Sequence, residues 1–511
     1  MFYSPLVRIG YGQGGIFLRK KLPIFYSALM LTGVNLLLRF AGTSFQVYLS
    51  GRIGPAGIGL LQLVMSVGSL AMVAGIGGIR TATMYLTAEE LGRKKPQNVT
   101  WVLSACFLYS ICFSGSIAAL LHHFAPWIAT VWIGDPRTVE ALQLFAAFLP
   151  VTCLCGVMTG YFTAAQRITT LAAVEVAEQI CSMALTLCAL SLFAGSDPVR
   201  ACLCVITGSG IGSILTLLCL ITIRLRETTP TGTPIQIGTR LARTALPLAV
   251  ADDLKSGIST VENLMVPKRL ALNTAVKSPL AAFGLISGMV FPVIMFPAAI
   301  LFALTELIIP DLARCSAAGS QKRIHYLVRK ALRTVLVYGI TMGGLLFLLS
   351  DVLCEALYHN TDAAGFMRAY ALLIPMLYCD IITDAMIKGL GQQTVCVRYN
   401  IFTSFLDVLF LYILLPRYGM DGYFASFLLT HLINFLLSLR RLLKITIRTI
   451  PVHISVMSVF AMFFGIWAAS HITHTFFRSI CYLLILGSLL FLLKVVHYED
   501  IRWLKGLVYK K

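Results

Sequence analysis

Apolar runs of roughly twenty residues recur along the whole chain, and they constrain its fold more than any other feature. A helix of that length crosses a bilayer core about 30 Å thick. Of the 511 residues, 58% are hydrophobic and only 12% are charged. A water-soluble protein of this size needs more charge to cover its surface. The sequence therefore predicts an all-α polytopic membrane protein.

We expect about fourteen transmembrane helices. Lys and Arg gather in the loops on the side of both termini, and the positive-inside rule places such loops in the cytoplasm. We therefore expect a multi-pass protein of the cell membrane with both termini in the cytoplasm. The predicted spans are 24–48, 57–80, 99–121, 139–161, 169–194, 199–223, 242–266, 280–308, 326–350, 366–388, 397–415, 420–443, 451–470 and 476–496.

The first twelve helices read as two related halves. Pro150 precedes Gln166 by almost the same distance as Pro375 precedes Gln392. Two such copies would form two six-helix lobes, a known transporter plan, with two helices added at the C-terminus. Both prolines remove a helix hydrogen bond, so we expect bends there. The predicted parts are a cytoplasmic segment 1–23, an N-lobe 24–223, an inter-lobe loop 224–241, a C-lobe 242–444, two further helices within 450–496 and a basic tail 497–511.

Two predicted helices carry polar stripes. At about 100° per residue, six polar side chains of span 242–266 share one face: Asp252, Lys255, Ser256, Ser259, Glu262 and Asn263. Asp253 lies at the edge of that face. Span 24–48 lines up Asn35, Arg39 and Gln46. Because a charge inside the bilayer usually faces a cavity or a partner, we expect these stripes to line a hydrophilic cavity between the lobes. The alternative is that pairs such as Asp252–Lys255 only hold helices together.

Further polar residues lie on single faces of later helices. Glu175 and Glu178 share one face, and so do Asp380 and Asp384. We regard these four as candidates for coupling transport to a cation or a proton. The stretch 397–415 aligns Asn400, Ser404 and Asp407. Three glycine pairs predict close helix contacts: Gly156/Gly160, Gly208/Gly212 and Gly284/Gly288.

Several classes of function lack support in the sequence. The net charge of +19 follows from the basic loops of a membrane protein, so we expect no nucleic-acid partner. The segment "GYGQGG" at 10–15 matches a dinucleotide-binding pattern, but no predicted strand precedes it. "HITH" at 471–474 offers two His without a third ligand. We expect no metal, no cofactor and no catalytic residues.

Longer stretches carry a family resemblance. "ALPLAV" with "SGISTVENLMVPKRL", and "FGLISGMVFPVIMFPAAILFALTELIIPDLA", resemble the stage V sporulation protein B family. So do "KGLGQQ", "LLPRYGMDGYFAS" and "RFAGTSFQVYLSGRIGPAGIGLLQL". That family lies within the multidrug/oligosaccharidyl-lipid/polysaccharide (MOP) flippase superfamily and is related to the lipid II flippases. The resemblance covers the first twelve helices.

The resemblance implies a MATE-like fold, alternating access and a lipid-linked saccharide as cargo for peptidoglycan or spore cortex synthesis. It also implies the lipid bilayer, and cell-wall or cortex synthesis proteins, as partners. Arg39 and Lys255 stand where relatives carry basic residues, while Phe45 and Gln46 stand where a second basic residue is expected after Arg39. A cation-coupled drug antiporter of the same fold, which the extra acids Asp252 and Asp253 favour, is the main alternative. An integral membrane glycosyltransferase fits less well.

Overall fold

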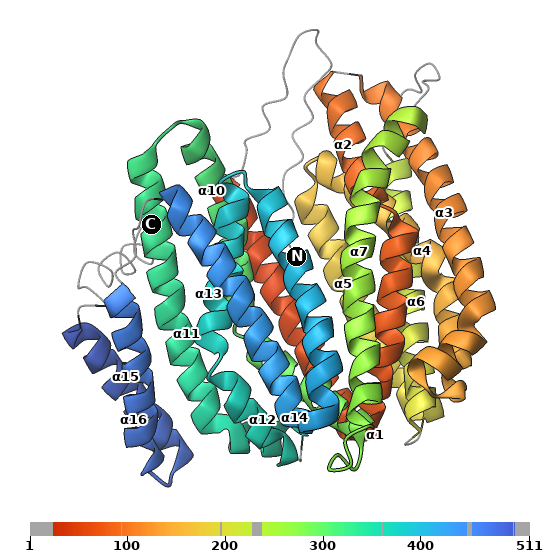
Figure 1. Ribbon diagram of the computed structural model, residues 1–511. Helices are drawn as coiled ribbons and strands as arrows, with labels where there is room; N and C mark the ends of the chain where they lie inside the picture. The colour runs from red at the N-terminus through yellow and green to blue at the C-terminus, as the bar shows by residue number, and fades with distance from the viewer. Residues whose placement is uncertain are drawn as a thin grey trace, which may run out of the picture.

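The computed structural model describes residues 24–93, 95–194, 197–226, 238–358, 361–446, 452–493 and 495. Every regular element in these ranges is a helix, which confirms the predicted fold class (Figure 1). Eight of the described helices are long and apolar enough to cross a membrane, or nine if one bent pair forms a single span. The count of fourteen stays a prediction. The segments 1–23 and 497–511, and most of the loop 224–241, lie outside the described residues.

The first long helix contains two of the predicted spans. Helix α1 (Ile24–Ile76) is kinked at Gly54, whose φ is 69°. A left-handed conformation of this kind favours glycine, because other residues have a Cβ that crowds the backbone there. Two more glycines with positive φ, Gly77 and Gly78, separate α1 from α2 (Ile79–Gly92). The second predicted span is thus interrupted near its C-terminal end.

The next helices keep close to their predicted ranges. Helix α3 extends past its predicted end to Trp127 and then becomes a π-helix that ends at Ile133. Helix α4 runs through Pro150 as one continuous element, so this proline does not divide its helix, and the bend expected there stays a prediction. The bounds are α3 (Val99–Trp127), α4 (Val139–Ala164), α5 (Ile168–Ala189) and α6 (Pro198–Leu225).

The second half begins with one straight helix and one broken helix. Helix α7 (Gly238–Leu270) has 33 residues. The predicted span 280–308 is divided into α8 (Pro279–Gly284), a π-helix (Leu285–Val290), α9 (Phe291–Met295) and α10 (Ala299–Ala317). The break between α9 and α10 contains Pro297, which has no N–H to continue the helical ladder.

The remaining helices include a second broken span. Helices α12 and α13 meet at an angle of 53° just before Pro375, as predicted for that proline. Helix α14 holds two predicted spans joined at Gly419, whose φ is 56°. The bounds are α11 (Gln321–Tyr358), α12 (Asp362–Ala371), α13 (Ile374–Gly389), α14 (Gln393–Thr446), α15 (Val452–Ser470) and α16 (Thr475–Leu492).

The two halves share a turn of the same construction. After α4, the amides of Ala165, Gln166 and Arg167 donate to carbonyls four, three and five residues earlier. After α13, the amides of Leu390, Gly391 and Gln392 do the same. Gln166 and Gly391 both have positive φ, and they are spaced like Pro150 and Pro375. The two turns are therefore alike, and the counterpart of Gln166 by conformation is Gly391 rather than the predicted Gln392, while the repeat of the two halves stays a prediction.

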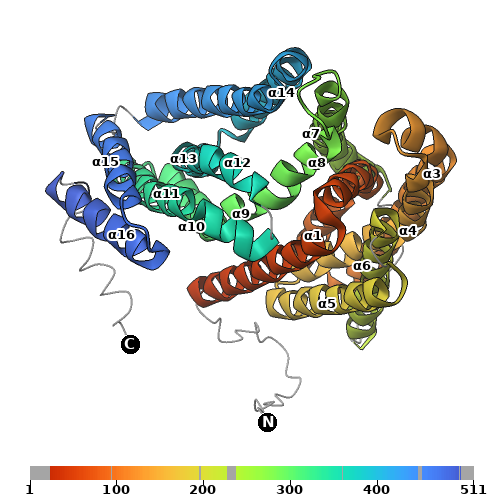
Figure 2. The ribbon, with the colours of Figure 1, turned by 90° about the horizontal axis from the view of Figure 1, so that it is seen from below.

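The helices form two groups with α7 between them. Seen from below, α3 to α6 lie on one side and α10 to α13 on the other (Figure 2). Helix α7 packs on α1 and α2 of the first group and on α14 of the second. Its residues Leu241 and Ala245 join a buried cluster with Ile79 and Leu86 of the N-terminal group. Helices α15 and α16 pack outside the second group, against α11.

Candidate functional site

The first candidate residue, Arg39, reaches from α1 to the broken helix of the second half. Its guanidinium carbon lies 4.6 Å from the ring centroid of Phe302 on α10. One of its nitrogens lies 3.5 Å from the carbonyl oxygen of Met295, at the end of α9. Next to it, Phe40 contacts Phe296 with ring centroids 5.9 Å apart. Arg39 therefore lies at the junction of the two halves. The side chain of Asn35 lies outside the described set.

The broken helix is held by tyrosine hydroxyls. Tyr378 donates to the carbonyl of Ile294 at 2.9 Å, and Tyr338 donates to the carbonyl of Pro297 at 2.8 Å. Buried polar groups need partners of this kind, since an unpaired carbonyl is costly away from water. Hydrogen bonds from other helices therefore stabilise the break.

Gln46 and two glycines connect α1 to the start of the same broken helix. Its amide nitrogen donates to the carbonyl of Gly288 at 3.0 Å. A Cβ at Gly284 would lie 1.9 Å from the carbonyl oxygen of Pro55, and one at Gly288 would lie 1.8 Å from a methyl carbon of Ile58. The pair Gly284/Gly288 therefore permits close contact, as predicted. The side chain of Gln46 serves in this contact between the halves.

The predicted polar stripe of α7 is divided among several surroundings. Lys255 and Ser259 are exposed, and their place in a hydrophilic cavity stays a prediction. Thr260 and Asn263 instead donate to Ser66 of α1, at 3.1 Å to its carbonyl and 3.0 Å to its hydroxyl. Asn263 thus holds helices together, which corrects its assignment to the cavity.

The acids of α7 face different neighbours. Asp253 lies within electrostatic range of Tyr109 on α3. Glu262 lies within such range of Asp407 on α14. The two acids therefore face opposite halves. The side chain of Asp252 lies outside the described set, so its place in the stripe stays a prediction.

The N-terminal half holds a small mixed cluster. Glu178 on α5 accepts a hydrogen bond from Ser213 on α6 at 3.3 Å. Glu175 lies within electrostatic range of Arg80 and Glu178. Arg80 is the second residue of α2, just after the glycine break, where its backbone packs against Gly160 of α4. The two predicted acids thus lie together, with one cation near them.

The C-terminal half holds a larger set of carboxylates. Asp380 on α13 accepts hydrogen bonds on both oxygens from the amide of Asn434, at 3.0 and 3.1 Å. One turn on, Asp384 accepts from Ser438 at 2.9 Å and from Asn400 at 3.3 Å. The two predicted acids are therefore arranged along one face of α13, against both arms of α14.

Asp407 extends this set toward α7. It accepts hydrogen bonds from Ser426 at 2.6 Å and from Thr430 at 3.3 Å. In the described part of the chain, none of Glu262, Asp380, Asp384 and Asp407 forms a salt bridge. We call these four residues the acidic cluster. Such a cluster inside a bilayer requires neutralisation by a proton or a cation.

Four of the five residues that donate hydrogen bonds to the acidic cluster were missed in the sequence, and only Asn400 was predicted. Ser426, Thr430, Asn434 and Ser438 recur every four residues along the second arm of α14. This spacing places them on one helical face, so the pattern was available. It was overlooked because single hydroxyl and amide groups are common in transmembrane helices and carry no charge.

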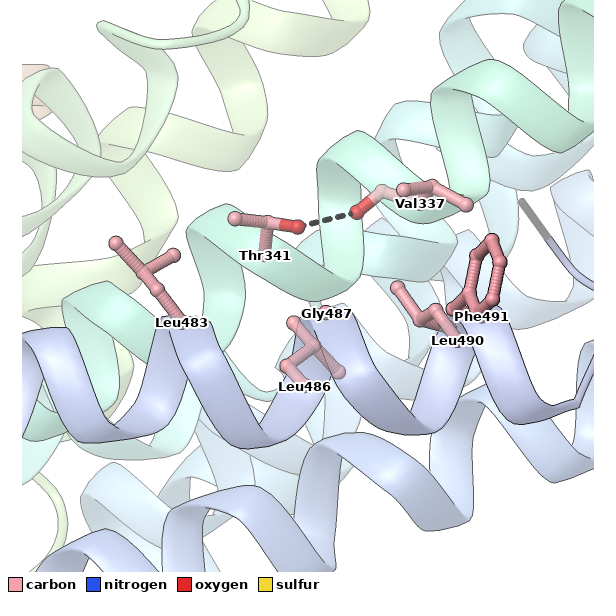
Figure 3. Close-up of a pocket in the computed structure, with 7 residues that line it drawn as sticks. All are labelled: Val337, Thr341, Leu483, Leu486, Gly487, Leu490 and Phe491. Carbon is pink, nitrogen blue, oxygen red and sulfur yellow. Dashed lines mark hydrogen bonds between the residues drawn. The ribbon is translucent and has the colours of Figure 1, made fainter. Parts of the chain in front are cut away.

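A separate pocket of about 290 Å³ lies between α11 and α16 (Figure 3). Its walls include Leu483, Leu486 and Phe491, and Gly487 lies at its floor. The hydroxyl of Thr341 donates to the carbonyl of Val337 at 2.8 Å, so this polar group is already satisfied. The pocket has no charged wall and lies away from Arg39, Lys255 and the acidic cluster.

Comparisons with known proteins agree with this arrangement. The MatE family model matches residues 32–194 and 269–413, one segment in each half of the chain and together more than half of its length. This chain belongs to the MatE family. It is also similar to stage V sporulation protein B of Bacillus subtilis (strain 168), with 22% identity over 401 residues, covering 76% of this chain and 77% of the relative. The predicted resemblance is thereby confirmed.

Solved structures show the same fold at low sequence identity. The lipid II flippase MurJ, in an inward closed conformation, aligns with a TM-score of 0.67 and 14% identity, over 92% of this chain and 99% of its own. An inward-facing multidrug resistance MATE family transporter of the MOP superfamily aligns with a TM-score of 0.63 and 12% identity, over 80% and 98%. The MatE-family chain is thus a multi-pass membrane transporter or flippase of the MOP superfamily.

Proposed function

We propose that this MatE-family protein is a flippase that moves a lipid-linked saccharide across the cell membrane by alternating access. The cargo is a precursor of the lipid II type for peptidoglycan or spore cortex synthesis, and both termini lie in the cytoplasm. The protein catalyses no covalent reaction. Its relatives include a lipid II flippase and a sporulation protein.

One observation carries this proposal: two exposed cations lie on the helices that join the halves. Arg39 is on α1 and Lys255 is on α7. In the described chain neither forms a salt bridge with a carboxylate. A diphosphate head group needs cationic partners to leave water, and Arg binds phosphate through two parallel hydrogen bonds. Ser259 lies one turn from Lys255 and offers a hydroxyl to the same head group.

The double variant Arg39→Ala/Lys255→Ala is expected to bind lipid II at least about tenfold more weakly. Each charge-assisted hydrogen bond contributes roughly 1.5–3 kcal/mol, and tenfold corresponds to about 1.4 kcal/mol. Native mass spectrometry of the purified protein with lipid II, a neutral lipid and a cationic drug measures this. A matched control is Lys277→Ala/Arg417→Ala, which removes two exposed cations elsewhere. Retained lipid II binding in the folded Arg39/Lys255 variant would refute the proposal.

The acidic cluster favours a second candidate, a cation-coupled antiporter of organic cations with the same fold. Four carboxyl groups within the transmembrane helices can take up protons or cations on one side and release them on the other. The same cluster can also couple lipid flipping to an ion gradient. The two candidates differ in cargo, so selective binding of the cationic drug over lipid II would give the antiporter priority.

Asp380→Asn/Asp384→Asn is expected to abolish the dependence of transport on an imposed Na⁺ or proton gradient. The amides keep the side-chain shape but lose the charge that a cation would balance, and each replaces one accepting oxygen by a donating nitrogen. Transport in liposomes, with and without each gradient, measures this against Glu175→Gln/Glu178→Gln in the other half. Unchanged gradient dependence in both double variants would exclude all four acids from coupling, while loss in the Glu variant alone would assign it to the N-terminal half.

A further inference from the structure

The contact between Arg39 and Phe302 links two helices from different halves of the chain. We propose that Phe302 is a positioning residue for Arg39, and that their contact keeps α1 against α10 until an anionic head group withdraws the guanidinium. This inference rests on the proposed function, because it concerns the same cation. It adds a residue to the site and a link between cargo binding and separation of the halves.

Among the described residues, the guanidinium has only weak partners. It lies over the ring face of Phe302 at 4.6 Å and at 3.5 Å from the carbonyl of Met295. A ring face attracts a cation through its quadrupole, and the carbonyl end of a helix carries partial negative charge. The neighbouring carbonyls of Ile294 and Pro297 already accept bonds from tyrosines. The Met295 carbonyl is therefore the one that the break presents to Arg39.

An anionic ligand can compete for this cation. The side chains of Arg39 and Phe302 are both exposed, and Phe302 is 40% accessible. Two parallel hydrogen bonds from a guanidinium to phosphate are stronger than a cation–ring contact at an exposed site. A diphosphate would therefore draw Arg39 away from Phe302, and the attraction between α1 and α10 would be lost at the same time.

The adjacent aromatic pair offers a reporter. The ring centroids of Phe40 and Phe296 lie 5.9 Å apart. Phe40 follows Arg39 in the chain, and Phe296 follows Met295. We would place Phe40→Cys and Phe296→Cys together and measure their linkage by a short bifunctional thiol reagent. Mass spectrometry of the linked peptides separates this pair from the 14 native cysteines. The linkage yield reports how often α1 lies against the break.

We would introduce Phe302→Leu and Phe302→Tyr separately into the Phe40→Cys/Phe296→Cys protein and compare the linkage rates without ligand. Leucine keeps an apolar side chain but has no ring face, whereas tyrosine keeps the ring. We expect leucine to lower the rate of linkage about three- to tenfold and tyrosine to leave it unchanged. Arg39→Gln should lower the rate as leucine does, which guards against a folding defect peculiar to position 302. Equal rates for phenylalanine and leucine would overturn the positioning role.

Adding lipid II in nanodiscs tests the release. We expect the linkage rate of the phenylalanine and tyrosine forms to fall toward that of the leucine form, and a neutral lipid to have no effect. An unchanged rate with lipid II bound would overturn the release and leave the proposed function standing. If native mass spectrometry finds no lipid II bound, the proposed function fails and the release with it, and the ligand-free comparison still decides the positioning role.

Discussion

Gly284→Val is expected to separate the kinked middle of α1 from α8 and to destabilise this arrangement of the halves by about 3 kcal/mol. The added Cβ would lie 1.9 Å from the carbonyl oxygen of Pro55 and 2.7 Å from the amide nitrogen of Gly59. Both are backbone atoms, so no side chain can move aside to make room. Overpacking typically costs about 1–3 kcal/mol, and more where backbone must shift.

The matched control for this prediction is Gly115→Val. Gly115 lies within α3, and a Cβ there would meet nothing within 4 Å. Both variants place a β-branched residue in a helical position, so their difference isolates the contact between halves. Thermal unfolding in detergent or nanodiscs measures it. Equal melting temperatures for the two variants would show that the halves do not meet at Gly284 in the membrane.

Asn434→Leu is expected to lower the free energy of unfolding by about 2–3 kcal/mol. Asn434 is 7% exposed and donates to both carboxylate oxygens of Asp380. Leucine removes both donors and leaves the carboxylate next to an apolar side chain. A hydrogen bond to a charged group contributes roughly 1.5–3 kcal/mol, and an acceptor left without its partner bears the desolvation penalty.

The double variant Asp380→Leu/Asn434→Leu provides the control. When both partners become apolar, little unsatisfied polarity remains, so much of the lost stability should return. A denaturant series on the wild type, both single variants and the double variant gives the interaction energy directly. Additive losses in the two single variants would show that Asp380 and Asn434 do not interact.

The helical character and the bend at Pro375 were predictable because each depends on local features. Apolar length indicates a span, and proline breaks a ladder wherever it lies. At Pro150, by contrast, α4 continues as one helix, so a proline does not by itself end a helix. The break at Pro297 went unpredicted although the residue type was the same. Local sequence shows where a helix can bend, and packing determines whether it does.

The sequence predicted which residues belong to the candidate site, but it predicted only part of their arrangement. A helical wheel placed Asn263 beside Lys255, since both share a face of α7. A helical wheel cannot show that Asn263 contacts Ser66 of α1 while Lys255 stays exposed. In the same way, Arg39 was expected in the site, whereas its contact with Phe302 required the tertiary structure.

The position of α7 has a consequence for movement. Its first part packs in the buried cluster of the N-terminal half, and its last part lies against α14, where the Arg269 guanidinium is 3.4 Å from the ring centroid of Tyr412. If the two halves move apart, a rigid helix cannot stay packed against both of them. If the halves move apart as the proposed alternating access requires, α7 must bend or detach at one end in each cycle. The boundary between the moving parts would then shift along the chain as the cycle proceeds.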